Sequence, residues 1–478
     1  MSNAIKYGLC LPLVVILPLV LWFLPTSCFG MEGLTIVQQR MIAIFVFAAL
    51  SWIMEVIPNW VTSLIVIVLM LLTVSTGGLS CVSPSGLEGL VDYKHIMSAF
   101  ADPVVMLFLG GFVLAHIAGK YGMDAVIAKS MLGIFGTRPK WVLLGFLITI
   151  ALFSMFMSNT ATAAMMLAFL APVLRSLPKE ETGRVGFALA IPFAANLGGI
   201  GTPIGTPPNA IAVGALQNAG YTITFGEWMA HMVPYMLIML LIVWGLLLLF
   251  FPFKSDKIEL HIPVQERKMD AKAWIAWITF FVTILLWVTE SLTGINSNIV
   301  ALIPVAIYTM TGVFTSEDLK EIDWSVLWLV AGGFALGTGL EETGLAHTMI
   351  NAIPFEHMNV ILVIVIAGLV CYGLSNFISN SATAALLIPI MVVVGHAMED
   401  PAAANHEAFA AAGGMSTLIP FVAICASLAM ILPISTPPNA IAASTKMVAT
   451  SQMAKVGVLI GIIGFALAYV MFTQIAIW

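Results

Sequence analysis

Two short polar stretches interrupt the otherwise apolar sequence, and the second repeats the first. Ser158, Asn159 and Thr160 lie within SMFMSNTATAAMM, and the corresponding serine, asparagine and serine lie within LSNFISNSATAALL at Ser379, Asn380 and Ser381. Each stretch is followed by a second shared motif, GTPPNAIA at 205–212 and STPPNAIA at 435–442. Because the pair recurs in the same order about 220 to 230 residues later, the chain is predicted to be an internal duplication. We expect the four stretches to form one binding site.

The composition places this duplication in a membrane. Apolar residues make up 60% of the 478 residues and charged residues only 9%. Apolar runs of roughly 18 or more residues recur from end to end, as bilayer-spanning helices require. The sequence therefore predicts an all-α polytopic membrane protein, whose first apolar stretch at 9–24 is an uncleaved helix.

The polar tips lie in stretches too short to form two full spans each. Each flank of the first tip has about 15 residues, or about 23 Å of helix, against a hydrocarbon core of roughly 30 Å. We therefore predict one re-entrant hairpin around Asn159 and another at 359–397. The adjacent prolines of the TPPN motifs, which cannot supply helical hydrogen bonds, predict helix breaks at 205–209 and 435–439.

The positive charges orient these segments. With the amino terminus in the cytoplasm, the chain forms eleven spans and two hairpins, and 16 of its 18 Lys and Arg residues lie on the cytoplasmic side, all but Arg40 and Lys94. The hairpins then enter from opposite faces. Each repeat holds five spans and one hairpin, an odd number of crossings, so the second copy is inverted relative to the first. Inverted repeats with broken helices predict a secondary transporter, here of the cell inner (plasma) membrane.

The asparagines suggest a cation site in each repeat. An amide oxygen beside a helix break lies near main-chain carbonyls that the break leaves free, and Na⁺ is bound by such neutral oxygens. Ser154 and Ser375 lie one helical turn before the motifs, and Gly205 and Ser435 lie at the predicted breaks. Alternatively, small polar residues at a helix contact only hydrogen-bond across to a neighbour. The duplication, together with the TPPN partners, favours the cation site.

The same tips suit an anion. Helix N-termini carry partial positive charge and free N–H groups, which bind carboxylates. The hydroxyls that accompany them belong to Ser158, Thr160, Ser379 and Ser381. Neither tip and neither TPPN loop contains a lysine or arginine. The charge of an anion bound there would be compensated by neighbouring Na⁺, so each ligand must raise the binding affinity of the other.

The sequence contains no motif typical of nucleotide hydrolysis, zinc-dependent catalysis or a serine nucleophile. It has no GxxxxGK[ST] phosphate loop, no HExxH zinc signature and no GxSxG nucleophile motif. We therefore expect no enzyme activity, no organic cofactor and no nucleic-acid partner.

The SNT, SNS and TPPN motifs resemble those of the divalent anion:sodium symporter family, and the resemblance covers nearly the whole chain. It implies a homodimer of elevator type, in which a transport domain slides against a fixed scaffold. It also implies one Na⁺ site at Ser154, Ser158, Asn159 and Gly205, and a second at Ser375, Ile378, Asn380 and Ser435. Substrate contacts would come from both tips, from Thr206 and Pro207, and from Thr436 and Pro437. Ser381 departs from the family's usual threonine, which puts selectivity among dicarboxylates, citrate and sulfate in question.

On this basis the chain divides into six parts. They are a first scaffold part at 1–139, a first transport part at 140–220, a connecting helix at 221–252, a second scaffold part at 253–356, a second transport part at 357–450 and a last helix at 451–478. The predicted function is Na⁺-driven uptake of C4 dicarboxylates such as succinate, malate and fumarate. The alternatives are a Na⁺-independent dicarboxylate exchanger and a citrate or sulfate symporter of the same fold.

Overall fold

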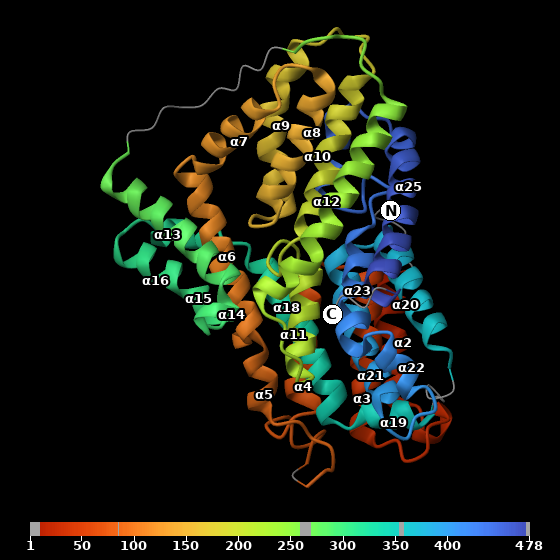
Figure 1. Ribbon diagram of the computed structural model, residues 1–478. Coiled ribbons are helices and arrows are strands. Elements are labelled where there is room, and N and C mark those ends of the chain that lie inside the picture. Colours follow the sequence, from red (N-terminus) through yellow and green to blue (C-terminus); the bar gives the residue numbers. More distant parts are fainter. Residues whose placement is uncertain (1–9, 85, 259–268, 353–357, 475–478) are drawn as a thin grey trace.

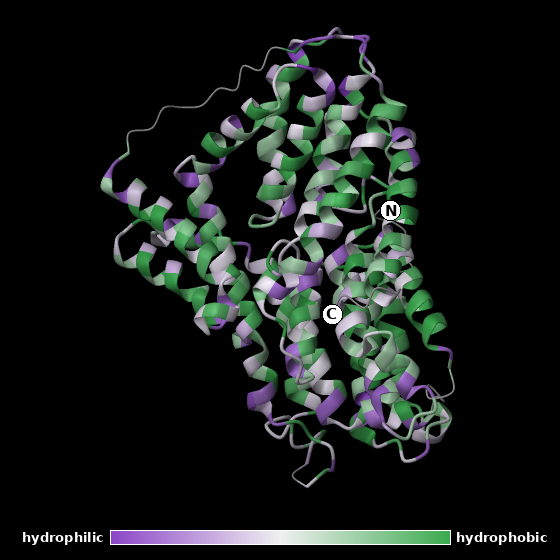
Figure 2. Cartoon of the chain, in the orientation of Figure 1, coloured by the Kyte–Doolittle hydropathy of each residue, from purple (hydrophilic) through white to green (hydrophobic). Residues whose placement is uncertain are grey.

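The computed structural model describes residues 10–84, 86–258, 269–352 and 358–474. Within these ranges the regular structure is helical, apart from a single β-bridge between Ser75 and Val91. Eight of the described helices are long and apolar enough to cross a membrane, and several shorter apolar helices accompany them. Figure 2 shows hydrophobic residues along the lengths of the helices and hydrophilic residues both near the loops at the two ends and in the middle of the molecule. The prediction of an all-α polytopic membrane protein is confirmed.

The helices of the first half follow one another in the predicted order. They are α2 (Leu11–Phe23), α3 (Ile36–Met54), α4 (Asn59–Thr73), α5 (Tyr93–Ser98), α6 (Pro103–Lys120), α7 (Met123–Ile134), α8 (Pro139–Ser154), α9 (Asn159–Arg175), α10 (Gly183–Ile200), α11 (Pro207–Asn218) and α12 (Phe225–Phe250). The two helices α8 and α9 form the first predicted hairpin, whose tip contains Ser158 at the N-cap of α9.

The second half repeats much of this order. It contains α13 (Ala271–Val288), α14 (Glu290–Thr293), α15 (Ser297–Val300), α16 (Leu302–Met310), α17 (Ser316–Lys320), α18 (Trp324–Glu342), α19 (Leu345–Ala352), α20 (Val360–Ser375), α21 (Asn380–Glu399), α22 (His406–Ala411), α23 (Gly414–Ser427), α24 (Pro437–Ser444) and α25 (Thr450–Tyr469). The second predicted hairpin is α20 and α21. Parts of the predicted segments, at 1–9, 259–268, 353–357 and 475–478, lie outside the described residues.

The predicted positions of the helix breaks are wrong by several residues. The backbone leaves the helix at 201–206 and at 428–436, before the proline pairs rather than at them. Pro207 and Pro437 are instead the first residues of α11 and α24. A proline fits this position because the first turn of a helix makes no use of its N–H group, and its fixed φ is already helical. The prolines therefore start the second half of each broken helix.

The hairpins and broken helices of the two halves pack against one another. Helix α10 contacts α8, α9 and α24, and α11 contacts α21 and α23. Close approach is possible at Gly198, where a Cβ atom would lie 2.5 Å from the backbone of Ala151. In Figure 1, α8 and α9 fill the upper part of the molecule with their connecting loop pointing down to its middle, while α20 and α21 lie below.

Two further long helices, α6 and α18, contact each other and the broken helix α11. Both contain a Gly-Gly-Phe motif, and its two glycines face different neighbours. A Cβ at Gly110 would collide with Ala301, next to α15, and one at Gly332 with Ser63 of α4. The following glycines, 111 and 333, face Ile204 and Ala385 of the broken-helix and hairpin unit. Each motif thus contacts a neighbouring segment on one side and the site-bearing helices on the other.

Candidate functional site

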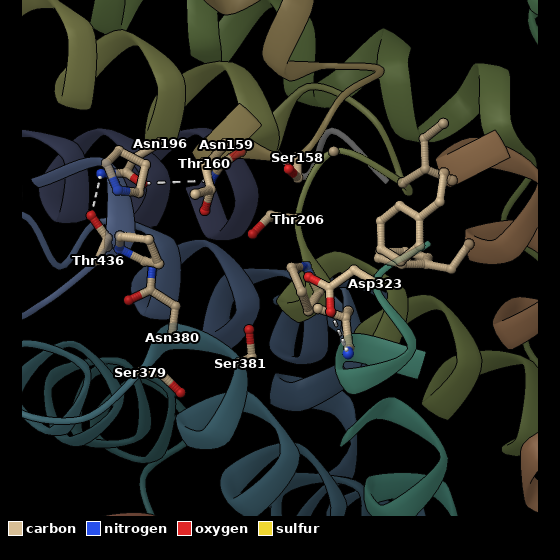
Figure 3. Close-up of a pocket in the computed structure, with 18 of the residues that line it drawn as sticks. Ser158, Asn159, Thr160, Asn196, Thr206, Asp323, Ser379, Asn380, Ser381 and Thr436 are labelled. Atoms are coloured by element: carbon tan, nitrogen blue, oxygen red, sulfur yellow. Dashed lines mark hydrogen bonds between the residues drawn. The ribbon is translucent and has the colours of Figure 1, made fainter. Parts of the chain in front are cut away.

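A cavity of about 200 Å³ lies where the two hairpin tips and the two helix breaks meet. Its lining includes every residue predicted to contact substrate, namely Ser158, Asn159, Thr160, Thr206, Pro207, Ser379, Asn380, Ser381, Thr436 and Pro437. Figure 3 shows these side chains converging from separate helices. The volume is below the roughly 300–1,000 Å³ of pockets for drug-sized ligands, so the cavity suits a small molecule. The structure thus brings together stretches that are about 220 to 230 residues apart in sequence.

Four helices begin at this cavity. Their N-cap residues are Ser158 for α9, Ser379 for α21, Thr206 for α11 and Thr436 for α24, and all four line it. The hydroxyls of Ser158 and Ser379 each accept a bond of 3.2 Å from a main-chain N–H in the first helical turn. Helix N-termini place partial positive charge and free N–H groups at their ends. The converging ends make the cavity favourable for an anion.

A matching pair of hydrogen-bond nodes lies behind the two tips. In the first, the Ser154 hydroxyl lies 2.7 Å from Asn159 Oδ1 and 2.6 Å from the Ala195 carbonyl oxygen. In the second, the Ser375 hydroxyl lies 2.8 Å from Asn380 Oδ1 and 2.7 Å from the Ala426 carbonyl oxygen. Both serines are fully buried. Each hydroxyl has one proton and two oxygen atoms within reach, so it donates to one of them at a time.

The first node contains further oxygens. The side-chain amide of Asn159 also lies 3.1 Å from the Gly205 carbonyl oxygen and 3.2 Å from that of Ala195. With its nitrogen turned toward them, the amide donates to these oxygens and to the Ser154 hydroxyl. With its oxygen turned toward them, four neutral oxygens face one another. Such an arrangement of side-chain and main-chain oxygens at a helix break is suited to Na⁺.

The other predicted cation ligands lie close to these nodes. Gly205 and Ser435 line the cavity, whereas Ser154, Ser375 and Ile378 are buried behind it. Ser435 also connects two elements, because its hydroxyl donates to the Asn376 carbonyl in the second tip at 3.0 Å. In the first half, the hydroxyl that donates to the matching tip carbonyl, that of Met155, belongs to Thr202.

Several polar residues of the site are missed by the sequence analysis. Asn196 of α10 lines the cavity and donates to Thr436 Oγ1 at 3.0 Å and to Asn439 Oδ1 at 3.3 Å. It also lies 3.5 Å from Asn159 Nδ2, so it joins the first tip to the second helix break. A lone asparagine in an apolar helix gives no signal in the sequence that its partners lie 240 residues away.

The TPPN asparagines have a definite structural role. Asn209 Nδ2 donates to the carbonyl oxygens of Gly199, Ile200 and Thr202, at 2.9, 3.2 and 2.8 Å. Asn439 Nδ2 donates to the Leu432 carbonyl at 2.9 Å. These side chains satisfy carbonyl groups released where the helices break. This role could have been predicted from the sequence, because the TPPN motif occurs in both halves.

A second cavity of about 550 Å³ continues from the first along α6. The two share Phe112, Ser158 and Asp323. Asp318, in the wall of the second cavity, is held by Lys120 at 2.6 Å and by His116 at 2.9 Å. Desolvation opposes ionisation of this carboxyl group, but hydrogen bonds from Lys120, His116 and Thr315 outweigh it and keep the pKa of Asp318 below its ordinary value. This second cavity, called the entrance cavity below, places charged side chains next to the site.

Comparisons with known proteins agree with this architecture. The YdaH transporter of Alcanivorax borkumensis shares the fold, with a TM-score of 0.52 and 11% identity over 79% of this chain and 86% of that chain. An uncharacterized transporter of Haemophilus influenzae is 32% identical over 477 residues, which cover 94% of each protein. The sodium-dependent dicarboxylate transporter SdcS of Staphylococcus saprophyticus is 27% identical over 480 residues, covering 93% of this chain and 87% of that protein.

The sequence model of a family described as "Citrate transporter" matches residues 49–414, most of the chain. Its members and the relatives above are transporters rather than enzymes. The predicted resemblance to the divalent anion:sodium symporters is confirmed, and the chain belongs to the citrate transporter family of secondary transporters.

Proposed function

We propose that this protein is a Na⁺-coupled symporter that carries C4 dicarboxylates such as succinate, malate and fumarate into the cell. The observation that carries the proposal is the duplicated node of a serine hydroxyl, an asparagine oxygen and a main-chain carbonyl behind each tip of one cavity. Two nodes give two candidate Na⁺ sites that flank a single anion site. The relatives named as sodium-dependent dicarboxylate transporters support the same assignment.

The anion site explains why transport would depend on Na⁺. Among the described residues that line the cavity, none is a lysine or arginine. A dicarboxylate would therefore be held by hydroxyl groups, helix N-termini and the two Na⁺ ions. Bound Na⁺ raises the affinity of the cavity for the nearby anion. The bound anion must then raise the affinity for Na⁺ by the same factor.

The transport step would be an elevator movement. We assign α8 to α11 and α20 to α24 to the moving part, and α2 to α7 and α13 to α19 to the scaffold. The contacts of the moving helices with one another support a unit that moves as a body. The inverted repeat would supply a second arrangement, in which the site opens to the opposite side of the membrane. By the family resemblance, the scaffold would also form the homodimer contact.

The orientation follows from the charge count. With the amino terminus in the cytoplasm of a plasma-membrane protein, 16 of 18 Lys and Arg residues lie inside. An inside-negative potential favours inward movement of each net positive charge by about 2.3 kcal/mol per 100 mV. Symport in which Na⁺ charge exceeds substrate charge would thus be driven by the potential as well as by the Na⁺ gradient.

The test is uptake of labelled succinate into proteoliposomes that contain the purified protein, with and without an inward Na⁺ gradient. We expect uptake only with Na⁺, and a higher Na⁺ requirement in Asn159→Ala and Asn380→Ala. Uptake that ignores Na⁺ but accelerates with internal dicarboxylate would instead identify an exchanger. Greater Na⁺-driven uptake of citrate or sulfate than of succinate would reassign the substrate within the same mechanism.

A further inference from the structure

The anion cavity contains one carboxylate. Among the described residues that line it, Asp323 is the only one with an ionisable side chain. Figure 3 shows it on the side of the cavity away from Asn196 and Thr436. Its side chain is exposed and lies where the site cavity joins the entrance cavity. Because a fixed negative charge repels a bound anion, the presence of Asp323 in this site calls for a functional explanation.

The hydrogen bonds of Asp323 do not neutralise it. Its carboxylate caps α18 by accepting a bond from the Val326 N–H at 3.4 Å. No ion pair to Asp323 is found in the part of the chain that the structure describes. The lysine in the entrance cavity, Lys120, is engaged by Asp318 and by the Val313 carbonyl. The charge of Asp323 therefore faces the mouth of the site.

The placement of this charge divides the cavity into two electrostatic regions. The N-termini of α9, α11, α21 and α24 favour negative charge at the tips and breaks. At the mouth, Asp323 cancels the favourable end of a fifth helix, α18, and repels any anionic group that extends toward it. A ligand with two carboxylates at the tips avoids Asp323, whereas a third carboxylate pointing outward meets it.

We propose that Asp323 is a specificity-determining residue that excludes substrates with a third ionised carboxylate. The inference rests on the proposed function and narrows its substrate class to small dianions. Rejection acts through charge, because a neutral group at this position would leave the shape of the cavity nearly unchanged.

The chain offers well-matched variants. Asp323→Asn removes the charge and keeps an equally good N-cap for α18, and Asp323→Ser provides a second uncharged cap. Glu321→Gln makes the same change of charge two residues away, at a side chain that lines only the entrance cavity. It controls for the general effect of removing one negative charge.

The experiment measures inhibition of Na⁺-driven labelled succinate uptake at alkaline pH by unlabelled succinate and by propane-1,2,3-tricarboxylate. In Asp323→Asn, the inhibition constant for the tricarboxylate relative to that for succinate should fall about fivefold, the order expected for two unit charges about 4 Å apart in water. Glu321→Gln should keep the wild-type ratio. Choline chloride at constant Na⁺ should weaken discrimination in the wild type, because the charge is exposed.

The outcomes separate this proposal from the one it rests on. Succinate uptake that does not depend on Na⁺ would contradict the proposed symport. Na⁺-driven uptake with an unchanged tricarboxylate ratio in both Asp323 variants would overturn the role of Asp323 alone. A higher Na⁺ requirement with no change in the ratio would assign Asp323 to cation binding, and discrimination insensitive to ionic strength in the wild type would also refute exclusion by charge.

Discussion

Gly199 of α10 offers a sharp test of the first Na⁺ site, because it touches the site without being a ligand. A Cβ atom at this position would lie 2.5 Å from Oδ1 and 3.1 Å from Nδ2 of Asn159, and 3.1 Å from the Gly205 carbonyl oxygen. Ordinary contacts begin at 3.4 Å. In Gly199→Ala, the amide of Asn159 must therefore move by about 0.9 Å, whereas metal ligands must be placed within about 0.2 Å.

The expected loss can be estimated from this displacement. Forcing one extra methyl group into a packed site costs about 1–3 kcal/mol. If Asn159 leaves the first node to relieve the strain, Na⁺ binding must bring the side chain back. The free energy of the strain is then subtracted from the free energy of Na⁺ binding. The Na⁺ concentration for half-maximal succinate uptake should then rise by about 5- to 150-fold, at tenfold per 1.4 kcal/mol.

The matched control is Gly245→Ala in α12. No atom of the described residues lies within 4 Å of a Cβ at Gly245, so this variant changes helix propensity without a collision. Proteoliposome uptake gives the Na⁺ dependence, and the rise in melting temperature with added Na⁺ gives binding independently of transport. A Gly199→Ala protein that melts normally and keeps the wild-type Na⁺ dependence in both assays would refute the proposed first site.

Three further predictions concern the node of the second half, the link between the halves and the entrance. Ser375→Ala removes a buried donor worth about 1–3 kcal/mol, so the Na⁺ requirement for uptake should rise about tenfold. Ser427→Ala removes a buried hydroxyl for which the described part of the chain offers no hydrogen-bond partner, and it should leave uptake unchanged. An equal rise in the Na⁺ requirement of both variants would contradict a Na⁺ site at Ser375. Asn196→Ala should lower the free energy of unfolding by about 1–3 kcal/mol and reduce thermal stabilisation by succinate, and a variant that succinate stabilises fully would show that Asn196 does not support the site. The pKa of Asp318 lies below its ordinary value of 3.8, so its stabilising contribution is complete above pH 3.8 and is lost only as the pH falls through the lower folded value. Asp318→Asn should therefore lower the melting temperature at pH values well above 3.8, and a difference that disappears at neutral pH would show that the hydrogen bonds from Lys120 and His116 are not stabilising.

The sequence predicts the helical hairpins and the membership of the site because both depend on local patterns. A polar tip between two short apolar flanks specifies a hairpin, and the duplicated motifs identify the tips that meet. The same local reasoning places the breaks too late. Proline is recognised as a helix breaker, but Pro207 and Pro437 begin helices, and the non-helical backbone at 201–206 and 428–436 precedes them.

Residues whose role depends on distant partners are not predictable in this way. Asn196 acquires its meaning only when the fold brings Thr436 within 3.0 Å. Asp323 reads as an ordinary charge between two apolar segments until the structure places it in the wall of the cavity. In both cases the sequence shows the residue but does not show which distant residues become its neighbours and determine its chemistry.

The differences between the two nodes bear on how the two Na⁺ sites would work. Around Asn159 the space is set by backbone, since a Cβ at Gly205 would lie 2.4 Å from the Gly199 carbonyl oxygen. Around Asn380 the corresponding break carries Ser435, whose hydroxyl ties it to the second tip. Close backbone packing cannot adjust without moving helices, whereas a hydroxyl can rotate. We therefore expect the first site to be the more rigid and the more selective for Na⁺ over larger cations, and the second to be the one whose occupancy follows substrate binding.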